Sequence, residues 1–260
     1  MASMKIAFTR PVSESLASCE LTYLEREPID LARAREQHAA YERLLQSLGR
    51  QIVRLPALDE HPDAVFVEDA AVALDELAIV APMGAPSRGG ESATVEAALR
   101  RFLPVHRLTP PATLDGGDVM RVDRRLFIGL SQRTNAAAVD QLARMLRPYA
   151  YEVVPVSVRG ALHLKSASTH LGGEAVLANP DWIDVAPLDG LEIVPAAASE
   201  PWGASVLLVD TTLVMPAGFP RTLELLRWRG LCVEVIDLSE LRKAEGGPTC
   251  LSILLPRGTR

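Results

Sequence analysis

Hydrophobic and polar positions repeat along this chain in one recurring order. An amphipathic helix is followed by a short β-branched strand that ends at a Pro or a polar residue, and then by a second apolar strand that carries polar side chains. In the first copy, Asp30 can cap a helix that ends at Gly49. The apolar stripe of this helix would be formed by Leu31, Ala34, Tyr41, Leu44, Leu45 and Leu48.

Five copies of the unit fill the chain, and the fourth is degraded. We expect helices at 30–49, 91–102, 135–146 and 221–229, first strands at 51–56, 105–108, 152–156, 191–195 and 231–237, and polar-bearing strands at 63–69, 113–120, 162–167, 202–209 and 248–255. The polar-bearing strands recur at intervals of about 40 to 50 residues, which is typical of radial or solenoid arrays. If the units surround one axis, their polar side chains converge at its centre.

Charge and composition exclude several classes of protein. The formal net charge is −6 and Lys and Arg are scattered, so we expect no nucleic-acid partner. No apolar stretch approaches the roughly 20 residues of a membrane-spanning helix. The N-terminal segment lacks the features of a secretory signal. These observations together predict a cytoplasmic protein without a membrane partner.

Three residues from different copies could form a nucleophilic site. Cys250 follows a Gly-Gly-Pro turn that leaves its thiol accessible at the start of a strand, and a buried core cysteine is the alternative. A cysteine nucleophile needs a base and a third group that orients the base. His163 could be that base, with Asp115 holding it in one tautomer. The alternatives are a core histidine and an Asp-Gly turn.

The other two cysteines, Cys19 and Cys232, are expected to be structural. No pair of cysteines has CxxC spacing, which argues against a disulfide framework and against a structural zinc site.

Carboxylates and guanidinium groups lie in other segments that converge at the predicted centre. Asp63 begins one polar-bearing strand, and Glu68 and Asp69 end it. Because neighbours on a strand point to opposite faces, only one of Glu68 and Asp69 would face a given ligand. Arg88 and Arg133 lie in a loop and just before a helix, where each could bind a carboxylate. For all five residues the alternative is a solvated surface charge.

These motifs together resemble the dimethylarginine dimethylaminohydrolase (dimethylargininase) family of the guanidine-modifying, or pentein, superfamily. The resemblance covers essentially the whole chain, through motifs such as Pro62-Asp-Ala-Val-Phe-Val-Glu-Asp69, Thr113-Leu-Asp-Gly-Gly-Asp-Val119, Leu162-His-Leu-Lys-Ser166 and Gly246-Gly-Pro-Thr-Cys-Leu-Ser252. It implies a five-bladed α/β propeller of pseudo-repeated ββαβ units around a central active site, in a single catalytic domain over residues 1–260.

The resemblance also implies an activity and the residues that perform it. A cysteine hydrolase of this family converts N-omega-methylated arginine to citrulline and methylamine or dimethylamine through a covalent thiouronium intermediate. By this carry-over, Cys250 is the nucleophile, His163 is the general acid and base, and Asp115 is the partner of His163. The implied substrate contacts are Asp69 for the guanidinium, Asp63 for the α-amino group, Arg88 and Arg133 for the α-carboxylate, and Glu68, Leu21 and Glu245 in addition. No metal or organic cofactor is implied.

Two features of the sequence bear on the choice of substrate. Glu245 stands where the family usually has Asp, and the added methylene could shrink the pocket. Residues 13–28, which include Leu21, are a long non-periodic loop and a candidate lid. Arginine deimination, amidinotransfer, hydrolysis of another guanidine and non-catalytic binding of an arginine-like ligand are the alternative functions. The sequence leaves open whether the protein is a monomer or a homodimer.

Overall fold

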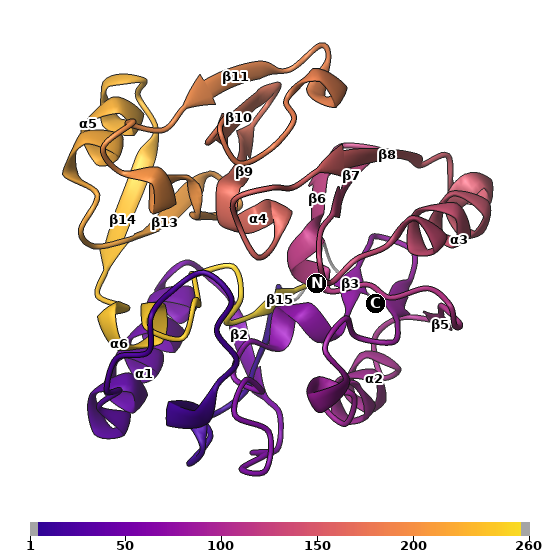
Figure 1. Ribbon diagram of the computed structural model, residues 1–260, viewed down its shortest axis with the longest axis horizontal. Helices are drawn as coiled ribbons and strands as arrows, with labels where there is room; N and C mark the ends of the chain where they lie inside the picture. The colour runs from indigo at the N-terminus through magenta and orange to yellow at the C-terminus, as the bar shows by residue number, and fades with distance from the viewer. Residues whose placement is uncertain (1–4, 256–260) are drawn as a thin grey trace.

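In the computed structural model, residues 5–255 form five three-stranded sheets around a common centre (Figure 1). In each sheet, the middle strand pairs antiparallel with one neighbour and parallel with the other. The sheets are β3–β4–β5 (Val72–Ala73, Ala78–Val80, Val105–Arg107), β6–β7–β8 (Val119–Val122, Arg125–Leu130, Glu152–Ser157), β9–β10–β11 (Ser168–Gly172, Ala175–Ala178, Glu192–Pro195), β12–β13–β14 (Leu207–Val209, Thr212–Pro216, Cys232–Ile236) and β15–β1–β2 (Ile253–Leu254, Ile6–Thr9, Gln51–Arg54). The expected five-bladed α/β propeller is confirmed.

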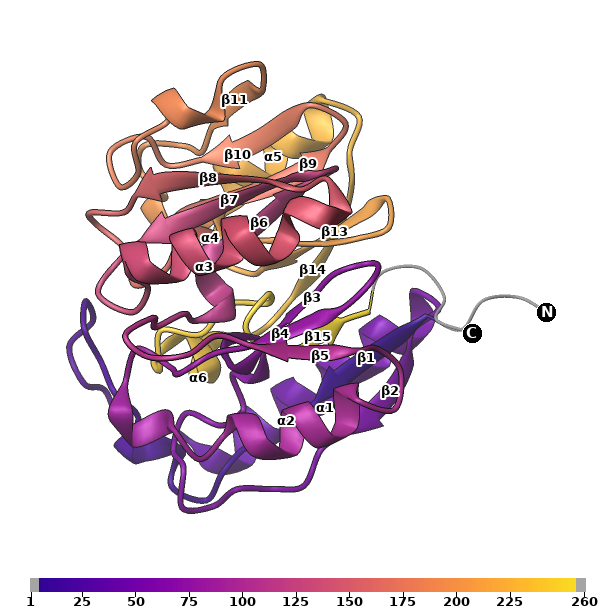
Figure 2. The same cartoon turned by 90° about the vertical axis from the view of Figure 1, so that its right-hand side faces the viewer.

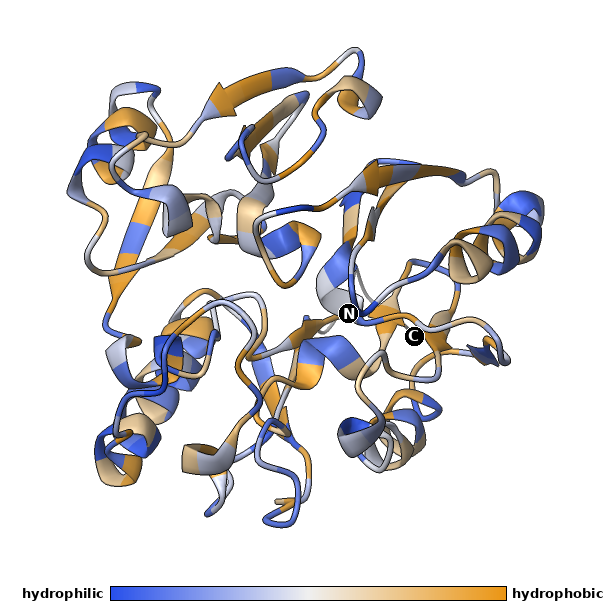
Figure 3. Ribbon diagram, in the orientation of Figure 1, coloured by the Kyte–Doolittle hydropathy of each residue, from blue (hydrophilic) through white to orange (hydrophobic). Residues whose placement is uncertain are grey.

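The longer helices lie on the outside of the sheets, away from the centre (Figures 1 and 2). They are α1 (Leu31–Ser47), α2 (Ser92–Leu99), α3 (Ala136–Leu146) and α5 (Pro220–Trp228). In four blades the order of elements is ββαβ, while the degraded fourth copy has a 3-10 turn, Ala186–Leu188, in place of the helix. Figure 3 shows both hydrophobic and hydrophilic residues on the outer helices and mainly hydrophobic residues on the strands near the centre.

Local sequence signals set the ends of two of these helices. The side chain of Asp30 accepts a hydrogen bond from the backbone N–H of Arg33 and caps α1, as expected. Gly49 follows the helix with a φ of 81°, a conformation that glycine adopts without strain. Asn135 caps α3 in the same way, by accepting from the N–H of Ala138.

The prediction of extended strands was wrong for most of each polar-bearing segment. Residues 63–69, 113–118, 162–167, 202–206 and 248–252 form turns, irregular segments, 3-10 helices and the short helix α4 (Leu164–Ala167). The physical reason is that many of their backbone N–H groups bond to carbonyls about three residues earlier, as Phe66 does to Asp63, and a few bond across blades instead of along a ladder. The N–H of Glu68 donates to the carbonyl of Cys250, and the N–H of Leu164 donates to the carboxylate of Asp118.

The pattern also missed β1 and the middle strands β4, β7, β10 and β13. Each of these four middle strands is short and follows its partner after a tight turn, so it leaves no separate periodic signal. In two of the turns an aspartate adopts the left-handed conformation, with φ of 51° at Asp123 and 55° at Asp210.

The last strand of the described chain joins the first blade and holds the Cys250 turn in place. β15 pairs antiparallel with β1, with Ala7 opposite Leu254. Helix α1 supports the same turn through Tyr41, whose side chain is fully buried. The Tyr41 hydroxyl lies 2.8 Å from the carbonyl oxygen of Pro248 and 2.7 Å from the hydroxyl of Ser252.

No helix among residues 5–255 is long and apolar enough to cross a lipid bilayer. The expectation of no secretory signal rests partly on residues 1–4, and these lie outside the described residues, as do 256–260.

We expect Tyr41→Phe to lower the free energy of unfolding by about 1 to 2 kcal/mol, because a buried carbonyl and a buried hydroxyl lose a hydrogen-bond partner. Urea denaturation measures the change. Tyr149→Phe is the matched control, since no hydrogen bond of its hydroxyl is found within residues 5–255. Equal stability of the wild type and Tyr41→Phe would contradict this account of the anchored turn.

Candidate active site

The thiol of Cys250 lies in the turn between α6 (Ser239–Arg242) and β15. The residue is 9% exposed. The backbone N–H of Gly247 points at the sulfur, with the nitrogen 3.4 Å from Sγ. Burial, followed by the negative charges of Asp69 and Glu68, raises the pKa of Cys250 to about 12. In the empty site the thiol is therefore protonated at neutral pH.

His163 stands at the N-terminus of α4 and pairs with Asp115, as expected from the sequence. Its Nε2 lies 3.1 Å from Oδ2 of Asp115. Oδ1 of Asp115 accepts the N–H of Gly84 at 2.9 Å, so both oxygens of this fully buried carboxylate are used. Burial lowers the pKa of His163, but Asp69, Asp115 and Asp118 outweigh it and raise the pKa to about 9. The imidazole is therefore protonated at neutral pH.

Asp69 is the carboxylate that links the histidine to the rest of the site. Its Oδ2 accepts a hydrogen bond of 2.6 Å from Arg88 Nη1. Its Oδ1 accepts the N–H of Gly117 at 3.2 Å and lies 3.8 Å from His163 Nδ1. Burial raises the pKa of Asp69, but the charges of His163 and Arg88 outweigh it and lower the pKa. Gly117 is required here, because a Cβ would lie 2.6 Å from His163 Nδ1.

The two arginines predicted to bind a carboxylate differ in how many of their N–H donors already have partners. Arg88 donates to both side-chain oxygens of Glu91 and to the backbone carbonyls of Asp63 and Phe66, besides Asp69. Its donors are nearly all occupied.

Arg133 is less fully used. Its Nη2 lies 3.0 Å from Glu20 Oε2, and its buried Nη1 has no hydrogen-bond partner among the described residues. Arg133 is therefore the arginine with a free donor for a ligand carboxylate.

Residues from four blades line one small cavity around the thiol. The lining residues are Glu20, Asp63, Phe66, Asp69, Arg88, Arg133, Leu162, His163, Ala244, Glu245, Gly246 and Cys250. The structure thus brings together all the predicted site residues except Glu68 and Leu21, with Asp115 directly behind His163. The cavity volume of about 20 Å³ has room for little more than one water molecule. The site is closed.

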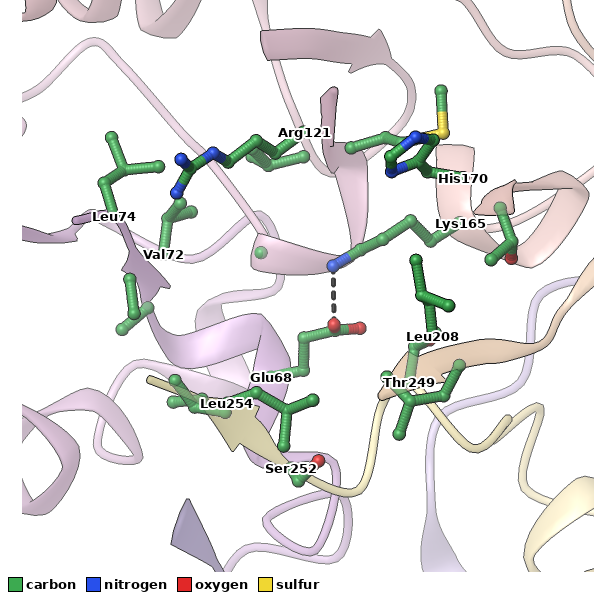
Figure 4. A pocket seen from close by; sticks show the side chains of 18 of the residues that line it. Glu68, Val72, Leu74, Arg121, Lys165, His170, Leu208, Thr249, Ser252 and Leu254 are labelled. Atoms are coloured by element: carbon green, nitrogen blue, oxygen red, sulfur yellow. Dashed lines mark hydrogen bonds and ion pairs between the residues drawn. The ribbon is translucent and has the colours of Figure 1, made fainter. Parts of the chain in front are cut away.

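Glu68 and Asp69 diverge, although they lie on a 3-10 helix and not on the expected strand. Glu68 borders a second cavity of about 280 Å³ between the blades, where its Oε1 lies 2.5 Å from the Nζ of Lys165 (Figure 4). Leu21 packs against the hydrophobic core between α1 and the Cys250 turn. Neither side chain lines the cavity with the thiol.

Glu245 binds the candidate lid through one oxygen. Its Oε1 accepts the backbone N–H groups of Thr22, Tyr23 and Leu24 at 2.9, 2.5 and 2.7 Å. The added methylene noted in the sequence therefore extends the carboxylate to the loop. The loop is held a second time by Asp63, whose Oδ2 accepts the N–H of Glu20 at 3.1 Å. Burial raises the pKa of Asp63 to about 6.

Sequence reasoning missed Glu20 and Glu91. Glu91 could have been found, because it lies three residues after Arg88 and an Arg–Glu pair at this spacing meets on a helical turn. Glu20 carries no local signal. It lies in a non-periodic loop, and its partners Ser87 and Arg133 come from distant parts of the chain.

Asp69, Asp115 and His163 also offer three possible metal-ligand atoms within 4.8 Å of one another. Each of the two carboxylates already accepts a backbone N–H and pairs with an arginine or the histidine. A metal ion would have to displace these interactions.

The arrangement brings together a thiol, a protonated histidine and a buried carboxylate in a small, largely buried cavity. A cationic electrophile bound at Asp69 would bring positive charge to the buried thiol and favour its ionisation. The protonated His163 can donate to a leaving group and can then act as a base. This chemistry fits the displacement of an amine from a guanidinium carbon.

Comparison of the sequence and the structure with known proteins finds similar proteins whose activity is described. A sequence profile described as "N,N dimethylarginine dimethylhydrolase, eukaryotic" matches residues 21–186. The N(G),N(G)-dimethylarginine dimethylaminohydrolase of Streptomyces coelicolor is 39% identical over 98% of both chains. That of Pseudomonas aeruginosa is 36% identical over 86% of this chain and 89% of its own. A solved structure of a Cys-to-Ser mutant of the Pseudomonas aeruginosa enzyme with citrulline superposes with a TM-score of 0.89, at 33% identity over 98% of this chain and all of the other.

We expect Glu245→Ala to release the loop at residues 22–24. Three N–H groups lose a charged acceptor, so their hydrogen exchange should accelerate about 10- to 100-fold. Alanine keeps the β-carbon at a residue with φ of 59°, which leaves the backbone preference nearly unchanged. Exchange measured by mass spectrometry tests this, with Glu192→Ala, an exposed ion-pair residue on another blade, as the control. Unchanged hydrogen exchange at residues 22–24 would contradict the conclusion that Glu245 holds this loop.

Proposed function

This chain belongs to the dimethylarginine dimethylaminohydrolase family, and on that premise we propose that Cys250, His163 and Asp115 are its catalytic residues. The protein is a hydrolase that acts on a C–N bond of a linear amidine and converts methylated arginine to citrulline and methylamine or dimethylamine. One observation supports this assignment of residues above the others. The thiol, the protonated histidine and a buried carboxylate meet in a single closed cavity.

Asp69 holds the guanidinium of the substrate near the thiol. Its Oδ1 faces both the cavity and His163, while Arg88 fixes its other oxygen. We therefore assign Arg88 to the orientation of Asp69. Arg133, with its free Nη1, binds the α-carboxylate, and Asp63 binds the α-amino group.

The first half of the reaction breaks the C–N bond. The bound guanidinium lowers the pKa of Cys250, whose proton leaves to water, and the thiolate then attacks the guanidinium carbon. A C–S bond forms and the carbon becomes tetrahedral. The protonated His163 donates to the dimethylamino nitrogen, the C–N bond breaks, and dimethylamine leaves. A positively charged thiouronium remains on Cys250.

The second half releases the product. His163, now neutral, takes a proton from water that attacks the thiouronium carbon. The C–S bond breaks, the hydroxyl proton of the adduct passes to the departing sulfur, and citrulline leaves with Cys250 again a thiol and His163 again protonated. Asp115 stabilises the imidazolium at both ends of the cycle through the 3.1 Å contact.

We expect the protein to form citrulline from asymmetric dimethylarginine and from monomethylarginine, and Cys250→Ser to lose at least about 10⁴-fold in kcat. A colorimetric citrulline assay, with arginine in parallel, measures this. Preference for arginine would favour the deiminase alternative. If no substrate is turned over, alkylation of Cys250 with and without a guanidino ligand tests whether it is the nucleophile. Cys232 is exposed and would also react, so it is first replaced by Ser. Failure of a guanidino ligand to change the alkylation of Cys250 in that variant would contradict the assigned nucleophile.

We expect kcat to fall as the pH rises through about 9, because in the substrate complex, where Cys250 has already lost its proton, His163 then loses the proton that the leaving amine requires. Asp115→Asn removes a charge that raises the pKa of His163, so this limb should move to lower pH. The variant should also lose about 10²-fold or more in kcat. The pH profiles of the wild type, this variant and the exposed control Asp140→Asn test the pairing. An unmoved limb in Asp115→Asn would contradict it.

Three expectations extend the proposal. We infer that residues 1–260 form one catalytic domain, since the first blade of the ring is completed by β15 near the end of the chain. The homodimer and the cytoplasmic location stay predictions.

A further inference from the structure

The carboxylate of Glu20 lines the same cavity as Cys250 and His163. It enters from the candidate lid. Its Oε2 lies 3.0 Å from Arg133 Nη2, and its other oxygen accepts a hydrogen bond from the Ser87 hydroxyl. A residue of the loop thus contacts the arginine that would bind the substrate's α-carboxylate.

The interaction leaves Arg133 only partly available. An arginine binds a carboxylate best through two parallel N–H donors, and Glu20 already occupies Nη2. The free donor is Nη1, which is buried and has no partner within residues 5–255. A second carboxylate bound at Nη1 would lie beside the first one and be repelled by it.

Glu20 is ionised when it makes this contact. The Ser87 hydrogen bond and the charges of Arg133 and Arg88 lower its pKa. Its side chain is 42% exposed, while that of Arg133 is 10% exposed, so the ion pair lies at the rim of the cavity. The ion pair thus borders the solvent side of a cavity that has room for about one water.

We propose that Glu20 is a specificity-determining residue that acts as a tethered competitor of the substrate's α-carboxylate for Arg133. In the empty enzyme it occupies the subsite for the amino-acid end of the substrate. A ligand that carries an α-carboxylate must displace it, and the cost appears in the binding constant. The inference rests on the proposed function, because that function assigns the α-carboxylate to Arg133.

Glu20→Gln is the sharpest test of competition. It removes the charge and keeps the size of the side chain. The loop stays held, because Asp63 accepts the backbone N–H of residue 20 and Glu245 accepts the backbone N–H groups of residues 22, 23 and 24. Ser87→Ala weakens the hold on Glu20 without changing its charge. Glu14→Gln is the matched control, since Glu14 belongs to the same loop but pairs with Arg35 outside the cavity.

We expect Glu20→Gln to lower the KM for asymmetric dimethylarginine about three- to tenfold with kcat unchanged, as befits a partly exposed ion pair. Ser87→Ala should lower KM in the same direction by less, and Glu14→Gln should leave it unchanged. With ω-dimethylated agmatine, which lacks the carboxylate, KM should not fall. A higher KM for dimethylarginine in Glu20→Gln would overturn the proposal, and so would an equal fall for the agmatine, which indicates a loosened loop.

Product binding tests the inference apart from turnover. Calorimetry should give citrulline a Kd about three- to tenfold lower in Cys250→Ser/Glu20→Gln than in Cys250→Ser. If the wild type turns over no methylated arginine, the proposed function fails while this comparison still tests the role of Glu20. An equal or higher Kd in the double variant, or no citrulline binding in either, would overturn it.

Discussion

The structure depends on keeping one buried carboxylate, Asp69, ionised at the centre of five blades. A buried charge is costly unless opposite charge and hydrogen bonds surround it. Arg88 supplies the charge at 2.6 Å, Gly117 supplies a backbone donor, and the imidazolium of His163 lies 3.8 Å away. These partners come from three different parts of the chain. The ring of blades is what brings them to one carboxylate, and removing any one would leave charge uncompensated.

This arrangement sets the protonation of the resting site. The carboxylates around His163 raise its pKa to about 9, and the same negative field, added to burial, raises the pKa of Cys250 to about 12. The empty site therefore holds a thiol and an imidazolium. Under the proposed function, a cationic guanidinium at Asp69 offsets this negative field at the sulfur, so the electrostatics that bind the substrate would also favour ionisation of the thiol.

Closure of the site is achieved by carboxylates as well. Glu245 accepts three backbone N–H groups of the loop, Asp63 accepts a fourth, and Glu20 pairs with Arg133. Under the proposed function, two of these acids also lie where the amino-acid end of the substrate would bind, so we expect ligand binding to compete with the contacts that hold the loop.

The sequence alone determined the five-fold repeat and the outer helices, and its motifs named the residues that we propose as the catalytic set, because periodicity and motif spelling are local properties. Asp30 and Gly49 bound α1 as their side chains and backbone dictate. It did not determine that the polar-bearing segments are turns, since many of their N–H groups bond to carbonyls about three residues earlier and a few bond to other blades. Nor did it determine where the carboxylates of Glu20, Glu68 and Glu245 point. Those directions depend on which cations and backbone donors are nearby once water is excluded, and only the tertiary structure decides that.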